Sequence, residues 1–287
     1  MKKVIFLITM MVCAAVFAQA QSEKPRIFVE KINKADAVSN DNAVLVRQAI
    51  LDGLTKTGRF ELIDAVTISG LEPELEKRQK EMADFILNAN VLTVSTNQKV
   101  KDGKTKYGCV LKYTVTVTDA KEQTTVGTKA FDHSPSGLGG LMDALELYDT
   151  KEKAIAGAAD MIDLDLKELI IEILPIEGTV NPSDYLAKKK KLQKCYINVG
   201  SSHGVKKGDY FAIMDATTRA GRTVYKEVAQ LKVEEVVDET LSYCKVTKKQ
   251  KEALVIIEKY AALDEEAQAK EPLKVKQIQE QKTFGIF

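Results

Sequence analysis

The chain has 287 residues, and its 42 Lys and Arg nearly balance its 41 Asp and Glu. This balance argues against a nucleic-acid partner, which would favour an excess of positive charge. The chain has no Trp and only two His, so few of the groups that usually transfer protons or hold metals are present, and an enzyme is disfavoured.

The first twenty residues predict a secretory signal peptide. Lys2 and Lys3 precede an apolar run over residues 4–17, which is shorter than the ~20 residues that a transmembrane helix needs. Ala18-Gln19-Ala20 offers small residues to a signal peptidase, so we expect cleavage between Ala20 and Gln21.

A lipid anchor is not expected on the mature protein. A lipobox places a small residue just before its cysteine, but Val12 precedes Cys13 here. The sequence therefore predicts a periplasmic or secreted protein, and it is long enough for two domains.

Residues 24–175 are expected to form an α/β domain that starts with alternating strands and helices. The expected elements are a strand over residues 26–32, a helix from Asn40 and Asp41 to about Thr57, a strand over residues 59–63 and a helix after the capping-box pattern at residues 69–72. Gly58 is placed to end the first helix. In the second helical segment we expect Leu75, Met82 and Phe85 to face inward.

Three strands in a meander should follow. Residues 85–95 are apolar on both faces, as in a central strand, whereas residues 107–118 alternate between apolar and polar side chains. Residues 123–132 supply the third strand. Turn signals at residues 101–104 and 119–122 separate the three.

A long helix should close this domain. It follows a loop rich in Gly and Ser at residues 133–140, runs from about Thr150 to Leu174 with one apolar face, and stops at Pro175.

Residues 176–258 show short alternating runs bounded by glycines and charged residues, which is typical of a small all-β barrel. The predicted fold class is therefore α+β, a mixed α/β sandwich followed by a small barrel. Residues 259–287 are mainly polar and charged, and we expect a tail that is partly helical or mobile.

The three cysteines beyond the leader carry no recognisable redox or zinc motif. Cys109, Cys195 and Cys244 are an odd number, so at least one lacks a partner within the chain. Alternation places Cys195 and Cys244 on the inner face of the barrel. Two buried free thiols and an internal disulfide both remain open, because alternation does not fix the Cα separation that a bridge needs.

Several phrases in the first domain resemble an envelope family that includes the curli secretion protein and the penicillin-binding-protein activators. They are Ala49-Ile50-Leu51-Asp52-Gly53-Leu54, Thr57-Gly58-Arg59-Phe60-Glu61-Leu62-Ile63-Asp64 and Ala83-Asp84-Phe85-Ile86-Leu87. The helix over residues 151–175 is similar to the one that closes that family's domain.

The second half resembles the carboxy-terminal module of the T-type flagellar assembly protein. The resemblance rests on Tyr196-Ile197-Asn198-Val199-Gly200 and on His203-Gly204-Val205-Lys206-Lys207-Gly208-Asp209-Tyr210-Phe211. Together the two resemblances imply a part of an envelope machine that acts by contact.

Sharper site hypotheses find little support in the sequence. His133 and His203 lack a second ligand at metal spacing, so surface or loop roles are expected for both. The run Gly137-Leu138-Gly139-Gly140 follows no clear strand, so a mobile loop is expected there. No catalytic, cofactor-binding or metal-binding residue is predicted. The lysine run at Lys188, Lys189, Lys190 and Lys191 is a candidate contact for an anionic ligand, although such runs are often solvated loops.

These observations predict a non-enzymatic adaptor or accessory subunit of a cell-envelope assembly, such as cell-wall synthesis, surface-fibre export or secretion. Its partner would be an envelope protein or a second copy of the chain, and peripheral association with the envelope is also allowed. One alternative is a periplasmic binding protein for an anionic or glycan ligand. Another is a subunit of an outer-membrane secretion pore.

Overall fold

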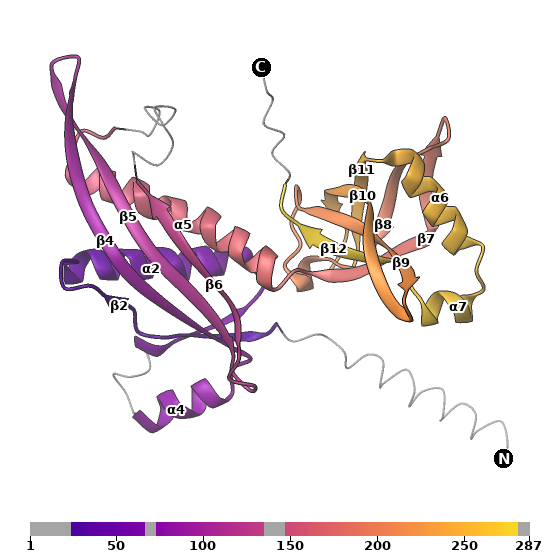
Figure 1. Cartoon of the computed structure of the whole chain (residues 1–287), viewed down its shortest axis with the longest axis horizontal. Coiled ribbons are helices and arrows are strands. Elements are labelled where there is room, and N and C mark those ends of the chain that lie inside the picture. Colours follow the sequence, from indigo (N-terminus) through magenta and orange to yellow (C-terminus); the bar gives the residue numbers. More distant parts are fainter. Residues whose placement is uncertain (1–23, 67–72, 135–146, 281–287) are drawn as a thin grey trace.

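The computed structural model describes residues 24–66, 73–134 and 147–280. The predicted cleavage site at Ala20 and Gln21, the capping box at residues 69–72 and the glycine run at residues 137–140 lie outside these ranges. The described chain forms a mixed sheet with helices, followed by a closed barrel (Figure 1).

The first sheet has the strand order β3-β1-β4-β5-β6, with β2 paired to β4. Strands β1, β2 and β3 run parallel to their neighbours, whereas β4, β5 and β6 form an antiparallel meander. The strands are β1 (Arg26–Val29), β2 (Asn33–Lys34), β3 (Glu61–Asp64), β4 (Phe85–Lys101), β5 (Lys104–Asp119) and β6 (Thr125–His133). The predicted meander and both of its turns are confirmed.

Two long helices, α2 (Asn40–Thr57) and α5 (Lys151–Ile173), pack side by side on one face of this sheet (Figure 1). Their apolar stripes meet the inner side chains of β5, which include Leu111, Tyr113 and Val115. The helices approach closely because Gly53 has no side chain: a Cβ there would lie 2.9 Å from Leu166.

Capping sets the ends of α2. The predicted end is confirmed, since Gly58 adopts the left-handed conformation with φ 71°. The start differs by one position, because Ser39 is the N-cap and its hydroxyl accepts a hydrogen bond from the Asn42 amide at 3.2 Å.

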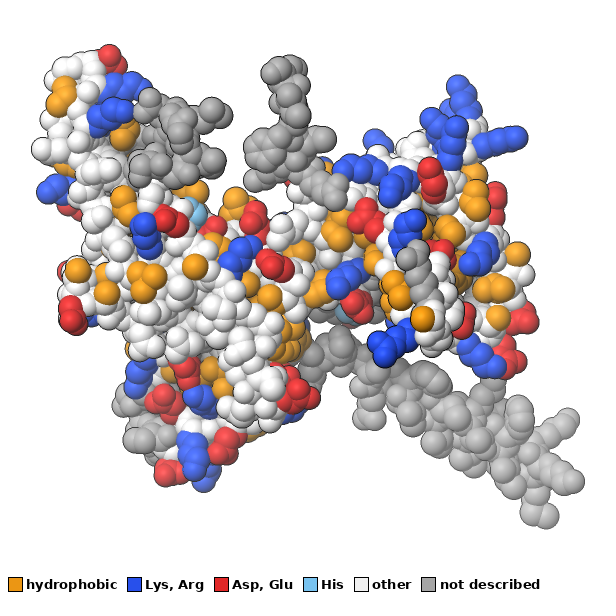
Figure 2. All heavy atoms as spheres, viewed as in Figure 1, with side chains coloured by type: hydrophobic (Ala, Val, Ile, Leu, Met, Phe, Trp, Pro, Cys, Tyr) orange, Lys and Arg blue, Asp and Glu red, His pale blue; other side chains and the backbone are white. Residues whose placement is uncertain are grey.

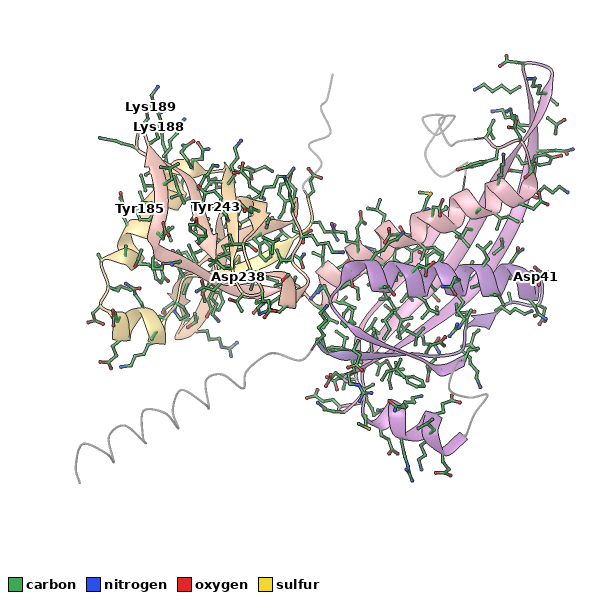
Figure 3. The ribbon with its side chains drawn as sticks, turned by 180° about the vertical axis from the view of Figure 1, so that it is seen from behind. Asp41, Tyr185, Lys188, Lys189, Asp238 and Tyr243 are labelled. Atoms are coloured by element: carbon green, nitrogen blue, oxygen red, sulfur yellow. The ribbon has the colours of Figure 1, made fainter. Side chains whose placement is uncertain are left out.

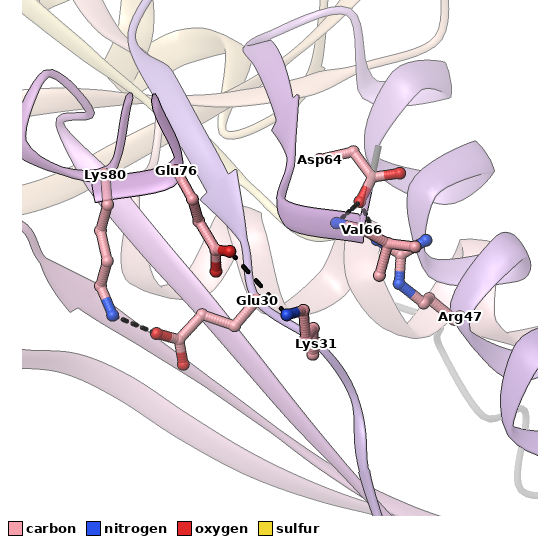
Figure 4. Close-up of polar contacts among 7 residues, drawn as sticks. All are labelled: Glu30, Lys31, Arg47, Asp64, Val66, Glu76 and Lys80. Carbon is pink, nitrogen blue, oxygen red and sulfur yellow. Dashed lines mark hydrogen bonds and ion pairs between the residues drawn. The ribbon is translucent and has the colours of Figure 1, made fainter. Parts of the chain in front are cut away.

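The short helix α4 (Pro73–Glu81) ends before Met82, whose side chain is 61% exposed. The prediction that Met82 faces inward was therefore wrong, because the helical spacing does not extend to it. Ion pairs fasten α4 to the end of β1: Lys80 contacts Glu30, and Lys31 lies 3.8 Å from Glu76 (Figure 4).

A similar polar contact joins α2 to the end of β3. Arg47 of α2 forms an ion pair with Asp64, which also accepts a hydrogen bond from the Val66 amide at 2.8 Å (Figure 4).

The second sheet is a closed antiparallel barrel with the order β10-β11-β8-β7-β12-β9. Its strands are β7 (Glu177–Lys188), β8 (Lys191–Ile197), β9 (Tyr210–Arg219), β10 (Arg222–Val236), β11 (Ser242–Lys248) and β12 (Lys274–Ile278). Helix α6 (Gln250–Ala261) packs against the barrel through Ala253, Leu254 and Ile257, and α7 (Glu265–Lys270) follows it.

The tail over residues 259–287 is partly helical as expected, since α7 lies within it, but the predicted end of the barrel at residue 258 needs correction. Strand β12 lies within the tail and completes the barrel between β7 and β9. Leu273, Val275 and Gln277 are buried. The backbone amide of Gln277 donates a hydrogen bond to the Ile176 carbonyl at 2.8 Å. Two apolar residues among lysines and glutamines are too weak a pattern to indicate a strand.

Candidate functional site

The cysteines predicted to face inward lie directly opposite each other. Cys195 on β8 pairs in register with Cys244 on β11, both side chains are buried, and both thiols are free. Burial raises the pKa of Cys195 to about 12 and shifts the pKa of Cys244 upward as well. These thiols are therefore poorly suited to act as nucleophiles.

The lysine run forms the tip of the β7–β8 hairpin. Lys188 pairs with Lys191, and Lys189 and Lys190 make the turn with φ angles of 53° and 58°. All four side chains are exposed, and the tip projects from the barrel (Figures 2 and 3).

His133 has a carboxylate partner that its sequence neighbours do not reveal. Its Nε2 lies 2.5 Å from Asp165 Oδ2 of α5, and the Tyr113 hydroxyl donates to the same oxygen at 2.6 Å. Asp165 is 32 residues from His133 in the chain, so no spacing signal could have found the pair. Burial, together with Asp165, raises the pKa of Tyr113 above its usual value. We interpret the trio as a structural link between β5, β6 and α5.

His203 has a local role at the start of a loop. Its Nδ1 accepts a hydrogen bond from the Gly200 amide at 3.3 Å. Within residues 24–66, 73–134 and 147–280, no group of three His, Cys, Asp or Glu side chains is arranged to hold a metal ion.

A groove of about 460 Å³ runs between α2 and α5 on the face turned away from the sheet. Its lining includes the small residues Ala49, Ala156 and Ala159, and Val44 is 66% exposed. Leu45 and Gln48 also line it, together with four carboxylates and one lysine: Asp41, Asp52, Asp160, Asp163 and Lys56. Figure 3 shows Asp41 at the end of α2 that is far from the barrel.

The sequence contained only a partial signal for this groove. Helical spacing that turns Val46 and Ile50 toward the sheet turns Val44 outward, about 200° away from Val46. A single exposed apolar residue is common on protein surfaces, so Val44 acquires meaning only from its place beside the groove. The acidic walls are not evident from sequence alone, because α2 and α5 are separated by more than ninety residues of chain.

The α/β part and the barrel meet at a polar joint, which lies at the ends of α2 and α5. Arg59 donates to the carbonyls of Ile170 and Leu174 at the end of α5, and Lys206 donates to the carbonyl of Lys56 at the end of α2. Lys167 of α5 lies 3.2 Å from the buried carboxylate of Asp209.

Small cavities flank the joint. One of about 60 Å³ is lined by Arg59, Lys167 and Asp209, and another of about 370 Å³ lies beside Leu164 and Tyr210. Burial lowers the pKa of Arg59 to about 10, against the opposing effect of Asp209.

Comparisons with known proteins give weak likeness. No family model and no curated protein matches the chain. Among solved structures, the chain is similar to a PelC dodecamer from Paraburkholderia phytofirmans, with 14% identity, coverage of 49% of this chain and 90% of that one, and a TM-score of 0.29. Lipoprotein GNA1162 from Neisseria meningitidis is 10% identical, with coverage of 42% of this chain and 92% of that one and a TM-score of 0.29. TolB from Acinetobacter baumannii is 11% identical, with coverage of 74% of this chain and 58% of that one and a TM-score of 0.27.

Likeness at these scores carries no argument about function. The resemblances to the curli secretion and penicillin-binding-protein activator family and to the flagellar module therefore stay predictions. Among the described helices, none is long and apolar enough to cross a membrane.

Proposed function

We propose that the protein is an exported, non-enzymatic accessory subunit of a cell-envelope assembly, which docks a partner protein in the groove between α2 and α5. The observation that carries this proposal is the groove itself: an open channel with a floor of small apolar residues, walls of aspartate and the exposed side chain of Val44. Export rests on the predicted leader.

The lining of the groove defines the chemistry of the partner. Four aspartates against one lysine give the walls a net charge of −3, and Lys56 is already engaged with Asp163 at 3.1 Å. A basic amphipathic helix fits such a channel, because its apolar stripe can contact Ala49 and Ala156 while its lysines or arginines meet the aspartates.

Site-specific photocrosslinking in intact cells tests this role. A photoreactive residue at Val44 should yield a crosslink to one envelope protein, whereas the same residue at Val255, which is 64% exposed on α6, should not. Mass spectrometry should place the crosslink in a partner segment with net positive charge.

Charge reversal supplies the second criterion. Asp160→Lys should reduce the Val44 crosslink severalfold, because it introduces repulsion at an exposed position without removing a core contact. A crosslink that persists in this variant, or that falls in an acidic partner segment, would rule out the proposed groove. Turnover of a wall-derived substrate by the purified protein would rule out the non-enzymatic role.

A further inference from the structure

Three lysines stand in a row across adjacent strands of the barrel. Lys232 on β10 pairs in register with Lys245 on β11, and Lys245 pairs with Lys194 on β8. All three point outward, since their neighbours Val233, Cys244 and Cys195 are buried in the barrel. Like charges directly opposite each other destabilise a sheet, so this row lowers the stability of the fold.

Two tyrosines lie beside the row. Tyr196 and Tyr243 are directly opposite each other on β8 and β11, with ring centroids 4.8 Å apart and an interplanar angle of 38°. The ammonium of Lys194 lies 4.9 Å from the centre of the Tyr243 ring. We call Lys194, Tyr196, Lys232, Tyr243 and Lys245 the tyrosine–lysine surface.

Three glutamates lie beside the three lysines and match their charge, so the excess of positive charge comes from Lys207, which also acts on Glu234, and from the lysine run at residues 188–191. Glu234 lies 2.8 Å from Lys194, and hydrogen bonding from Lys194 lowers the pKa of Glu234, with Lys245 and Lys207 adding to the effect. Glu235 on β10 lies opposite Tyr243 on β11 in the strand register. Glu280 lies near Lys232 at the β10 end of the row, where it accepts a hydrogen bond from the Tyr210 hydroxyl.

The lysine run at the tip of the β7–β8 hairpin, residues 188–191, extends the surface at the β8 end of the row. Lys191 precedes Lys194 by three residues on β8, a distance of about 10 Å along a strand. Positive groups therefore continue from the hairpin tip across three strands.

From this arrangement we propose that the tyrosine–lysine surface binds an anionic polysaccharide whose sugars carry carboxylates. Lysines in a row match the repeated charges of such a polymer, and the two half-buried tyrosine rings leave part of their apolar surface open for the C–H face of a sugar. A membrane headgroup layer would use the lysines but has no need of the paired rings. This inference goes beyond the docking role, because it concerns the opposite part of the molecule and a different kind of ligand.

Calorimetric titration of the purified protein with polygalacturonate tests the surface. Lys194→Gln combined with Lys232→Gln and Lys245→Gln should weaken binding about tenfold, as expected for three solvent-exposed ion pairs. The control carries the same charge change at exposed positions elsewhere: Lys77→Gln, Lys104→Gln and Lys251→Gln, and it should bind within twofold of the unmodified protein.

The tyrosines distinguish a glycan from other polyanions. Tyr196→Ala with Tyr243→Ala should weaken binding of polygalacturonate severalfold and leave binding of linear polyphosphate unchanged. If the triple variant unfolds, Lys245→Gln alone replaces the test, because Lys245 is exposed. This single variant should weaken binding of polygalacturonate about threefold.

Three results would overturn the inference: no binding, equal loss in the control variant, or tighter binding to vesicles of anionic phospholipid than to polygalacturonate. None of them affects the Val44 crosslink, so this inference and the docking role fail independently.

Discussion

The turn at the tip of the β7–β8 hairpin uses two lysines where the other tight hairpins use glycine. Asp102-Gly103 joins β4 to β5 and Ala220-Gly221 joins β9 to β10, each with both residues at positive φ. Lys189 and Lys190 adopt the same conformation without a glycine. A side chain at positive φ costs about 1 kcal/mol, so this turn is not optimised for stability. Exposed charge at the tip is consistent with a binding role.

Replacing the second turn residue should stabilise the protein. Lys190→Gly removes the Cβ penalty, and we expect the free energy of unfolding in urea to rise by about 0.5–1 kcal/mol. Lys191→Gly is the matched control: it places glycine inside β8 and should lower that free energy. A fall in stability for Lys190→Gly would show that the turn has a different conformation.

The cysteine thiols should react slowly in the folded protein. Burial raises the pKa of Cys109 to about 11 and that of Cys195 to about 12, so the thiolate is a trace species at pH 8. A chromogenic disulfide reagent should label the native protein slowly, with a rate that rises with pH up to pH 10. In urea it should label all three cysteines beyond the leader. Only one reactive thiol in urea would show that Cys195 and Cys244 are bridged.

Among the elements, the helices whose apolar stripe repeats over several turns could be predicted from the sequence. Helices α2 and α5 were predicted nearly to the residue, because each carries an apolar stripe over several turns and a clear end signal at Gly58 or Pro175. Strand β4 continues to Lys101, beyond the predicted end at residue 95, since hydrogen bonds to β5 hold its polar outer half. Strand β12 was missed because its place depends on the gap between β7 and β9.

The groove could be predicted only in part for the same reason. The outward position of Val44 follows from the spacing of a single helix, but both helices contribute to the apolar floor and the acidic walls, which therefore require knowledge of which helices are neighbours. Similarly, the row of Lys194, Lys232 and Lys245 depends on strand register across three segments of the chain. Sequence alone identified only the adjacent lysines at residues 188–191.

Asp84 should make stability depend on pH, because it connects the start of β1 to the β5–β6 turn. It accepts a hydrogen bond from the Arg26 amide at 3.0 Å, which is the main cause of its lowered pKa, and its other oxygen contacts Lys121 at 3.0 Å. A carboxyl whose pKa is lower in the folded state stabilises the protein above its usual pKa of 3.8 and loses that contribution as pH falls through the folded value.

Asp84→Asn should therefore lower the free energy of unfolding at pH 7 by about 1 kcal/mol, a modest value because the side chain is partly exposed. Denaturant titrations at pH 7 and pH 2 should show that the difference from the unmodified protein shrinks at the lower pH. Asp102→Asn, in an exposed turn, is the control and should change little at either pH. A difference that grows on acidification would contradict the assignment.

At the scale of the whole molecule, the joint sets how the groove and the tyrosine–lysine surface are positioned relative to each other. Arg59 follows α2, donates to carbonyls at the end of α5 and packs against the barrel loop, where a Cβ on Gly204 would lie 2.5 Å from Arg59 Cγ. One side chain, placed directly after α2, thus contacts the end of α5 and the barrel. A rigid joint of this kind would hold a docked partner at a fixed distance from a bound polymer.

Arg59→Met should loosen the joint while keeping much of the apolar bulk. It leaves carbonyl groups at the end of α5 without their donor, and we expect a loss of about 1–3 kcal/mol in the free energy of unfolding. Because the barrel and the α/β part each have their own core, the variant should unfold in two calorimetric transitions where the unmodified protein shows one. Arg78→Met, at an exposed position on α4, should keep the single transition. Two transitions already present in the unmodified protein would mean that Arg59 does not couple the two parts.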